Sequence, residues 1–313
     1  MLPSEIASIR LFAAVVLSVY SAAAGMAVFR LVQRFKRISP SLNQRLFARF
    51  VFGAAALGIL CFAYGYFIEP YWVDVTHVRL ASAKFRPGTG SVRVVHISDL
   101  HCDPAPRLEE RLPGVIAAQK PDLIVFTGDC VNSPMGVRVF KRCLTRLAEI
   151  APTYVVKGNW DAWYWSNLDL FGSTGAKELV AEAASLRIRG LELCLVGVPV
   201  GEEEKTDRVL ESVSPTAFVI FLYHYPDMIM EVARHNVDLY CAGHTHGGQV
   251  ALPFYGALVT FSRFGKRFEA GLYRVGKTWL YVNRGIGVEG GIVPRVRFCA
   301  RPEITVIDLI PVQ

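Results

Sequence analysis

The stretch Gly-His-Thr-His-Gly-Gly-Gln, residues 243–249, follows directly after an apolar run at residues 237–242. In extended backbone, residues i and i+2 point to the same side, so His244 and His246 can face one point in space. Glycines on both sides of the pair allow the backbone to approach that point closely. The pattern is typical of a metal site on a loop that leaves the end of a strand. Two ordinary polar loop histidines are the alternative interpretation.

Other strand-like runs upstream end in a similar way, in a short turn that carries Asp, His or Asn. They are residues 91–97 before Asp99 and His101, 122–126 before Asp129, 153–156 before Asn159, and 217–222 before His224. Helices are expected at about residues 107–119 and 136–150, and later strands at 278–282 and 304–309. Strands that alternate with helices predict an α/β fold with ligand groups gathered at the carboxyl ends of the strands.

These turns supply seven candidate metal ligands. They are Asp99, His101, Asp129, Asn159, His224, His244 and His246. Nitrogen and oxygen ligands without a thiolate suit Mn, Fe or Zn better than Mg or Ca. Seven groups are too many for one ion. They suit two divalent ions about 3.5–4 Å apart that share one carboxylate.

The blocks Asp-x-His, Gly-Asp, Gly-Asn-x-Asp, a lone His and Gly-His-x-His, in that order, resemble the calcineurin-like metallophosphoesterase family over about residues 92–310. The resemblance implies a four-layer α/β/β/α sandwich around a dimetal centre, with Mn as the expected metal and Fe or Zn as alternatives. The residues Gly-Gly-Gln at 247–249, Asn-Arg-Gly at 283–285 and Arg-Pro-Glu-Ile at 301–304 are similar to the membrane-associated branch of that family.

Carried over by position, the resemblance divides the ligands into two sets that share Asp129. It implies that Asp99, His101, Asp129 and His246 hold one metal, and that Asp129, Asn159, His224 and His244 hold the other. The catalytic centre is then built on Asp129, Asn159 and His244, with a hydroxide between the metals as the nucleophile. Two cations lower the pKa of such a water and take the charge that builds on phosphoryl oxygens during in-line displacement.

One position departs from the family pattern. Most members have His third in Gly-Asn-x-Asp, to stabilise the transition state or protonate the leaving group, but this chain has Trp160. A poor alkoxide leaving group benefits strongly from a general acid, whereas a phosphate leaving group needs little help. A residue other than His here also resembles the UDP-2,3-diacylglucosamine pyrophosphatases of the lipid A pathway. Replacement of the His by another side chain, or weak activity, is the alternative.

Two apolar runs near the N-terminus, residues 11–29 and 50–68, contain no charged residue. Each is about long enough to cross a hydrocarbon core of ~30 Å as a helix. We therefore predict that residues 1–72 form a two-helix membrane hairpin, that 73–90 form a linker, and that 91–313 form the metallophosphoesterase domain. Two buried core helices, or a cleavable signal at the first run, are the alternatives.

The charges lie unevenly along the chain. Residues 1–90 hold ten of the 34 Lys and Arg residues and three of the 27 Asp and Glu residues, so they carry the whole formal net charge of +7. Residues 91–313 are balanced, so we expect no nucleic-acid partner. The basic loop between the apolar runs favours an exterior catalytic domain by the positive-inside rule.

The scattered cysteines, interpreted as buried free thiols, favour a cytoplasmic domain instead. A shallow hairpin in one leaflet of the inner or plasma membrane satisfies both signals, so the side stays open.

The expected partners are membrane lipids and a phosphorylated lipid or sugar-nucleotide lipid substrate. Trp160, within the aromatic stretch 160–165, and the aromatic and basic stretch 254–268 are candidates to contact it. Arg284, Arg295 and Arg297 are candidate phosphate clamps, with surface ion pairs as the alternative. His77, His96 and His235 are interpreted as structural or solvated. The sequence indicates no oligomeric state.

The leading hypothesis is thus a membrane-anchored dimetal hydrolase that cleaves the pyrophosphate of UDP-2,3-diacylglucosamine to give UMP and the lipid 1-phosphate. A general phosphoesterase that acts on lipid or cell-envelope phosphoesters is the first alternative. A metal-bearing membrane scaffold without catalysis is the second.

Overall fold

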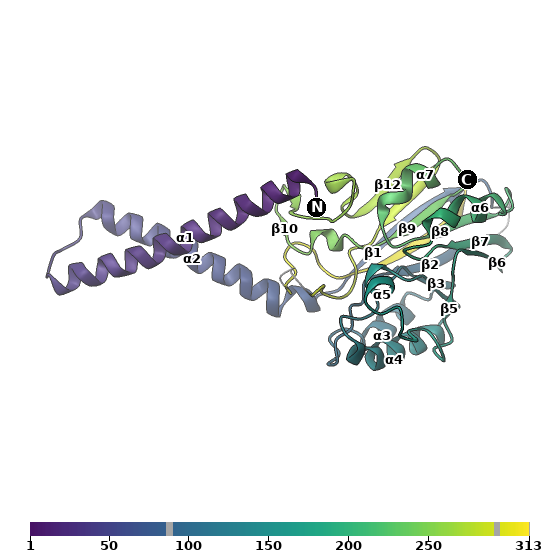
Figure 1. The fold of residues 1–313 in the computed structure, drawn as a ribbon, viewed down its shortest axis with the longest axis horizontal. Helices are drawn as coiled ribbons and strands as arrows, with labels where there is room; N and C mark the ends of the chain where they lie inside the picture. The colour runs from purple at the N-terminus through teal and green to yellow at the C-terminus, as the bar shows by residue number, and fades with distance from the viewer. Residues whose placement is uncertain (86–89, 291–294, 313) are drawn as a thin grey trace.

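The computed structural model describes residues 1–85, 90–290 and 295–312. Two long helices project from a compact α/β domain, and both the start of α1 and the end of α2 lie at that domain (Figure 1). The C-terminal strand lies inside the domain, far in space from the tip of the hairpin.

The hairpin consists of α1 (Pro3–Phe35) and α2 (Leu42–Phe67). The two helices contact each other, and the Tyr20 hydroxyl donates a hydrogen bond to the Ala55 carbonyl at 3.3 Å. The most apolar part of α1 is not buried at all, and that of α2 is only 17% buried. A helix that is apolar on every side and uncovered needs an apolar surrounding. Both helices are long and apolar enough to cross a membrane, and neither apolar stretch is buried in the core of the described domain.

One sheet collects the strands of the first half of the domain and the C-terminal strand. Its order is β1 (Asp74–Ser82), β14 (Glu303–Pro311), β2 (Val92–Ile97), β3 (Leu123–Phe126), β4 (Thr153–Val155) and β5 (Lys177–Glu178). The strands β2 to β5 are parallel to one another, so their carboxyl ends meet at one edge. β14 pairs antiparallel with β2, and β1, which pairs in parallel with β14, runs in the same direction as β14.

The second sheet has the order β12 (Gly271–Val275), β13 (Thr278–Val282), β9 (Leu239–Ala242), β8 (Phe218–Leu222), β7 (Leu191–Gly197) and β6 (Glu182–Ile188). Its four central strands are parallel. A small ribbon, β10 (Ala251–Leu252) with β11 (Gly256–Ala257), lies outside both sheets.

Three hydrophobic cores separate four layers. Side chains from both sheets, such as Val94 and Ile220, form the central core. The helices α3 (Leu112–Ala118) and α4 (Val137–Ala148) cover the first sheet. The helices α6 (Thr206–Glu211) and α7 (Ile229–Val232) cover the second. This is the predicted α/β/β/α sandwich. Its central strands are apolar on both faces because both faces are covered.

The predicted linker at residues 73–90 requires a correction. Residues 74–82 form β1, which pairs in parallel with β14 over nine residues. The backbone of this segment is therefore bound to the far end of the chain, and the hairpin joins the sheet almost directly after α2. Polar and apolar residues alternate in Thr-His-Val-Arg-Leu, as expected for an edge strand. The Pro-Gly turn of the predicted linker lies outside the described residues.

Candidate metal centre

All seven predicted ligands lie at one edge of the sandwich, where strands from both sheets end. Asp99 and His101 follow β2, Asp129 follows β3, Asn159 begins the short helix α5 (Asn159–Trp163) after β4, His224 follows β8, and His244 and His246 follow β9. Because these strands are parallel within their sheets, their carboxyl ends bring the groups together. The second sheet supplies three histidines and the first supplies the carboxylates.

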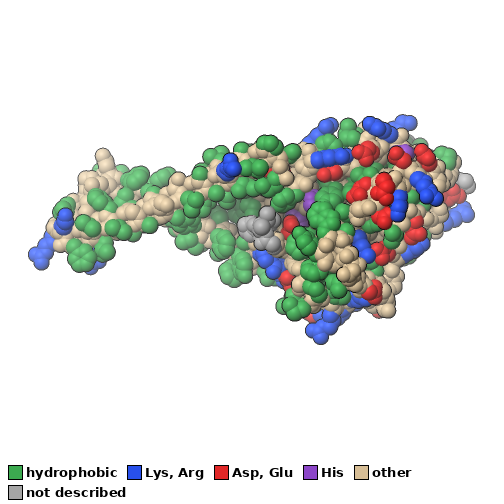
Figure 2. Space-filling model, in the orientation of Figure 1, with side chains coloured by type: hydrophobic (Ala, Val, Ile, Leu, Met, Phe, Trp, Pro, Cys, Tyr) green, Lys and Arg blue, Asp and Glu red, His purple; other side chains and the backbone are tan. Residues whose placement is uncertain are grey.

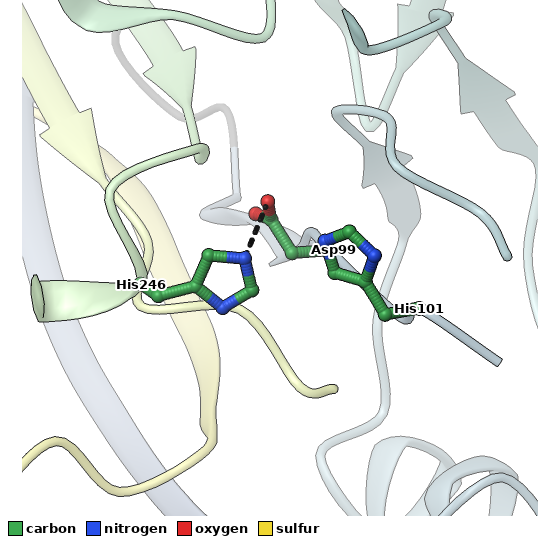
Figure 3. A group of neighbouring side chains, drawn as sticks. All are labelled: Asp99, His101 and His246. Atoms are coloured by element: carbon green, nitrogen blue, oxygen red, sulfur yellow. Dashed lines mark ion pairs between the residues drawn. The ribbon is translucent and has the colours of Figure 1, made fainter. Parts of the chain in front are cut away.

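The first group consists of Asp99, His101 and His246 (Figure 3). Their candidate ligand atoms all lie within 4.8 Å of one another. The Nε2 atom of His246 is 3.3 Å from Oδ1 of Asp99, and the imidazole rings of His101 and His246 lie 5.1 Å apart. All three side chains are buried. The spacing suits one cation held between them.

The second group consists of Asp99, Asp129 and His224. The Oδ2 atom of Asp129 is 3.2 Å from Nε2 of His224 and 3.5 Å from Nε2 of His101. Asp129 therefore lies between one histidine of each predicted metal set, which is the position of a bridging carboxylate. Asp99 belongs to both groups as well. The ring of His244 lies 5.2 Å from that of His224.

The backbone at the site is strained. Asp99, His101, Asp129, His244 and His246 all have positive φ, between 42° and 70°. Residues with a Cβ rarely adopt this left-handed conformation, and such strain concentrates at functional sites where the surroundings impose it. The turns therefore point the ligand side chains toward the site, and the left-handed backbone that this requires is energetically unfavourable.

Two glycines let the turns approach one another. A Cβ at Gly243 would lie 2.0 Å from Oγ of Ser98 and 2.3 Å from a carboxylate oxygen of Asp99. A Cβ at Gly158 would lie 2.2 Å from Oδ1 of Asp129. Neither position has room for a side chain, so the glycine residues of the motifs are required by close packing against the ligands.

The last residue of the Gly-Asn-x-Asp block braces the turns from behind. The buried carboxylate of Asp161 accepts hydrogen bonds from the backbone N–H groups of Gly158, Asp129 and Cys130. It ties the turn after β4 to the turn after β3. Asp161 thus orients two ligand-bearing turns without pointing into the site.

The chemistry of the donor set fits divalent cations. Within the described residues, buried His101 Nδ1, Asn159 Oδ1 and His244 Nε2 have no hydrogen-bond partner. Unpartnered buried polar atoms are costly unless something else binds them. Burial favours the neutral form of His224, but the Asp129 and Asp99 carboxylates outweigh it and raise the pKa of this imidazole. The site therefore attracts positive charge.

Trp160 is fixed against the ligands. Its backbone N–H donates to Oδ1 of Asp129 at 2.9 Å, and its ring packs edge-on against His101 at 5.2 Å. The indole N–H donates to Oε1 of Glu289 at 3.3 Å. Trp160 thus occupies a wall of the site and offers no group for proton transfer.

The prediction that Arg297 clamps a substrate phosphate requires a correction. Its guanidinium is fully buried and donates to the carbonyls of Arg284, Gly285, Gly287 and Ala300. One nitrogen also lies 3.2 Å from Nδ1 of His246. Burial lowers the pKa of this guanidinium to about 9. The guanidinium of Arg297 is therefore occupied by contacts within the domain, and it supports the ring of His246.

Arg284 and Arg295 are engaged in ion pairs as well. Arg284 contacts Asp74 at 2.9 Å and Glu303 at 3.3 Å, which joins the end of β13 to β1 and β14. Arg295 pairs with Asp103 near the surface. For Arg284 too, a structural role replaces the predicted phosphate contact, because two carboxylates already neutralise it. No local sequence signal could reveal these partners.

The structure adds one acidic residue that sequence reasoning missed. Glu289 lies against Trp160, and its backbone N–H donates a hydrogen bond to Oε1 of Gln249 at 2.8 Å. Burial, followed by the charge of Asp129, raises the pKa of Glu289 to about 7. It lies in an irregular segment after Asn-Arg-Gly and belongs to no motif, so the sequence contained no signal for it.

Residues 92–248 match the family model described as calcineurin-like phosphoesterase. The chain is 33% identical to the metallophosphoesterase YkuE of Bacillus subtilis, over 86% of this chain and 98% of that protein. The chain belongs to the calcineurin-like phosphoesterase family. It is thus a hydrolase of phosphoesters with the fold of dimetal enzymes.

Two further relatives extend the comparison. The phosphodiesterase YaeI of Escherichia coli is 31% identical, over 80% of this chain and 93% of its own length. A transmembrane protein with a metallophosphoesterase domain from Bos taurus is 28% identical, over 75% of this chain and 56% of its own length. Together with the two apolar helices, the transmembrane relative indicates that this calcineurin-like phosphoesterase associates with membranes.

Proposed function

We propose that this phosphoesterase hydrolyses a phosphate bond in a membrane-borne lipid, and that the substrate is UDP-2,3-diacylglucosamine. The observation that carries the proposal is the position of the candidate metal centre. It lies beside the start of α1, because His246 lines the same cavity as Ile9 and Phe12, and the apolar hairpin projects from the domain (Figure 2). A membrane lipid can reach such a site without leaving the bilayer surface.

In this proposal Asp99, His101, Asp129 and His246 hold one divalent ion. Asp129, Asn159, His224 and His244 hold the other, and Mn is the expected metal. When bound, two such ions supply Lewis acidity to water and to the phosphoryl oxygens. The protein supplies the alignment, because the carboxylate of Asp161 holds two of the ligand-bearing turns in place.

The pyrophosphate substrate is supported by Trp160. The ring of Trp160 fills the place next to His101 and cannot protonate a leaving group. Cleavage of a pyrophosphate releases a phosphate, which is a weak base and leaves readily without a general acid. A substrate of this kind explains why the site tolerates an indole at this position.

The test compares two substrates with the full chain in mixed micelles and added Mn. One is UDP-2,3-diacylglucosamine, with release of UMP as the readout, and the other is a simple aryl phosphodiester. We expect rapid UMP release that is lost in Asp129→Asn. Turnover of the aryl ester without UMP release would reject the sugar-nucleotide substrate. Full cellular function of Asp129→Asn would favour a non-catalytic scaffold.

The second candidate is a phosphodiesterase that acts on lipid or cell-envelope phosphodiesters outside the cytoplasm. The similarity to the phosphodiesterase YaeI supports it. So does the position of the basic turn between the helices, which includes Lys36 and Arg37 and lies at the far tip of the hairpin (Figure 2). If the hairpin spans the bilayer with this turn in the cytoplasm, the domain lies outside.

Sidedness separates the two candidates. Cys299 is exposed, whereas Cys102, Cys130, Cys143, Cys194 and Cys241 are buried. We expect a membrane-impermeant maleimide to leave Cys299 unlabelled in intact cells and to label it after lysis, as a cytoplasmic domain requires. Labelling in intact cells that is lost in Cys299→Ser would place the domain outside and favour the phosphodiesterase.

A further inference from the structure

A cavity of about 400 Å³ lies between the start of α1 and the candidate metal centre. Its apolar wall includes Ile9 and Phe12 of α1 and Leu258 and Phe261 of the domain. Its polar end includes His246 and Glu289. We refer to the space between these residues as the α1 cavity. Its volume is in the range of about 300–1,000 Å³ that is usual for small-molecule sites.

The α1 wall of the cavity is held by specific contacts with the domain. The buried carboxylate of Glu5 accepts hydrogen bonds from the N–H and hydroxyl of Thr260, at 2.8 and 2.9 Å. The hydroxyls of Ser8 and Tyr255 lie 2.6 Å apart. A carboxylate is rarely buried in an apolar helix without a specific partner. The first turns of α1 therefore belong to the catalytic domain, although the rest of the helix projects away from it.

The cavity is also continuous with the metal centre. His246, a candidate ligand, forms part of its polar end. Phe261 has a φ of 54°, which is strained for a bulky residue, and its main chain hydrogen bonds to His244. The segment at Phe261 thus forms part of the apolar wall of the α1 cavity, and it also supports His244, the other histidine of the Gly-His-x-His block. A molecule in the cavity would have its polar end at the metals.

We propose that the α1 cavity binds an acyl chain of the substrate while the phosphate lies at the metal centre. This inference rests on the proposed function, because it assumes a lipid substrate. Ile9 and Phe12 are 36% and 38% exposed, so the apolar wall continues onto the surface of α1, which leads into the bilayer. A chain can therefore pass from the membrane along α1 into the cavity without crossing water.

The chemistry selects an acyl chain over a polar group. The apolar wall would leave polar groups without partners, which is costly. Each methylene transferred from water into such a wall strengthens binding by about fourfold. The protein itself, and not only the bilayer, is therefore expected to favour substrates with long acyl chains. In this proposal α1 contributes to substrate specificity as well as to anchoring.

The test uses alkyl p-nitrophenyl phosphates with methyl, octyl or dodecyl chains and the full protein in lipid nanodiscs with Mn. In each turnover a water oxygen bonds to phosphorus and p-nitrophenolate leaves. We compare wild type with Ile9→Trp, which fills the cavity from α1, and Val259→Phe, which fills it from the domain. Leu11→Trp is the matched control, because Leu11 is 68% exposed on the same helix and does not line the cavity.

We expect the ratio of dodecyl to methyl kcat/KM to fall at least about tenfold in both filling variants and to stay unchanged in Leu11→Trp. Partition into the nanodisc affects all four proteins equally, so a changed ratio reports on the cavity. An unchanged ratio in both filling variants would overturn the inference. A fall in Leu11→Trp as large as in Ile9→Trp would overturn it too, because it would indicate a general effect of tryptophan on α1.

Binding is measured separately from turnover, as the anisotropy of a fluorescent NBD-labelled dodecyl phosphate without added metal. We expect binding to the wild type and at least tenfold weaker binding to Ile9→Trp. Binding to the wild type that is weakened in Ile9→Trp, without any hydrolysis, would support the cavity and reject the proposed function. Hydrolysis of every chain length, with no chain selectivity in turnover and equal binding to Ile9→Trp, would support the function and reject the cavity.

Discussion

The hairpin and the metal centre differ in how strictly the structure constrains the residue at each position. The apolar stretch of α1 is wholly uncovered and has no preferred face, so many apolar residues would serve equally well at each position. At the metal centre the ligands are buried and their backbones strained, and neighbouring glycine residues have no room for a methyl group. The anchor therefore requires only an apolar composition. The metal centre requires particular residues at particular positions.

The largest expected effect comes from removing a charge at the metal centre. Asp129→Asn keeps the shape of the side chain but loses the carboxylate between His101 and His224. Because changes behind a metal ligand already cost about 10- to 100-fold, we expect kcat/KM to fall more than about a hundredfold. Bound metal, measured by mass spectrometry, should fall in parallel. Asp169→Asn, at a mostly exposed ion pair, should retain both. Full activity of Asp129→Asn would refute the ligand assignment.

The next largest effect is expected at Arg297, which contacts the candidate ligand His246 and is not itself a candidate ligand. Lysine in Arg297→Lys cannot reproduce the planar fork that contacts four carbonyls and His246. We expect metal affinity to fall about 10- to 100-fold, as measured by titration of Mn into the purified protein. Arg295→Lys, at an exposed ion pair, should change it little. Equal affinities for the two variants would mean that Arg297 does not position His246.

A glycine substitution beside the ligands tests how tightly the turns of the metal centre are packed. In Gly243→Ala the new methyl would overlap Ser98 and Asp99. We expect the free energy of unfolding of the domain to fall by about 1–3 kcal/mol, as measured by denaturant titration with intrinsic fluorescence. An unchanged midpoint would show that the turns after β2 and β9 can move apart.

The smallest effect is expected in the hairpin. Among the described residues, none lies within 4 Å of a Cβ built at Gly25 or Gly53. Alanine is favoured over glycine inside a helix by about 0.5–1 kcal/mol. Gly25→Ala and Gly53→Ala should therefore raise thermal stability slightly and leave kcat/KM unchanged. A loss of activity in either variant would show that the anchor is more tightly specified than its composition implies.

Local patterns were enough to predict the ligand-bearing turns. Each apolar run that ends in Asp, Asn or His is a strand in the structure, because a strand covered on both faces is apolar throughout and its functional groups must lie beyond its end. The hairpin helices could be predicted for a similar reason, since length and lack of charge suffice. α1 extends beyond its apolar run at both ends and α2 at its N-terminal end, because a helix continues through polar residues.

Contacts between distant segments could not be predicted. β1 pairs with β14 across more than 200 residues of sequence, and a short alternating strand without its partner is indistinguishable from a linker. Arg284 and Arg297 were expected to contact phosphate because charge is visible in a sequence and its partners are not. Glu289 belongs to no motif and is placed beside Trp160 only by the fold.

The sequence by itself determined the apolar hairpin and the seven residues that gather at one edge, because each depends on a local pattern of hydrophobicity or spacing. The order of its motifs resembled one family, and that resemblance implied the four-layer architecture. Only the tertiary structure decided that the first turns of α1 close a cavity beside His246. In the sequence Glu5 is only an acidic residue ahead of the first apolar run, but in the structure its carboxylate is buried against Thr260. Such a contact depends on where two remote segments meet, which no local pattern specifies.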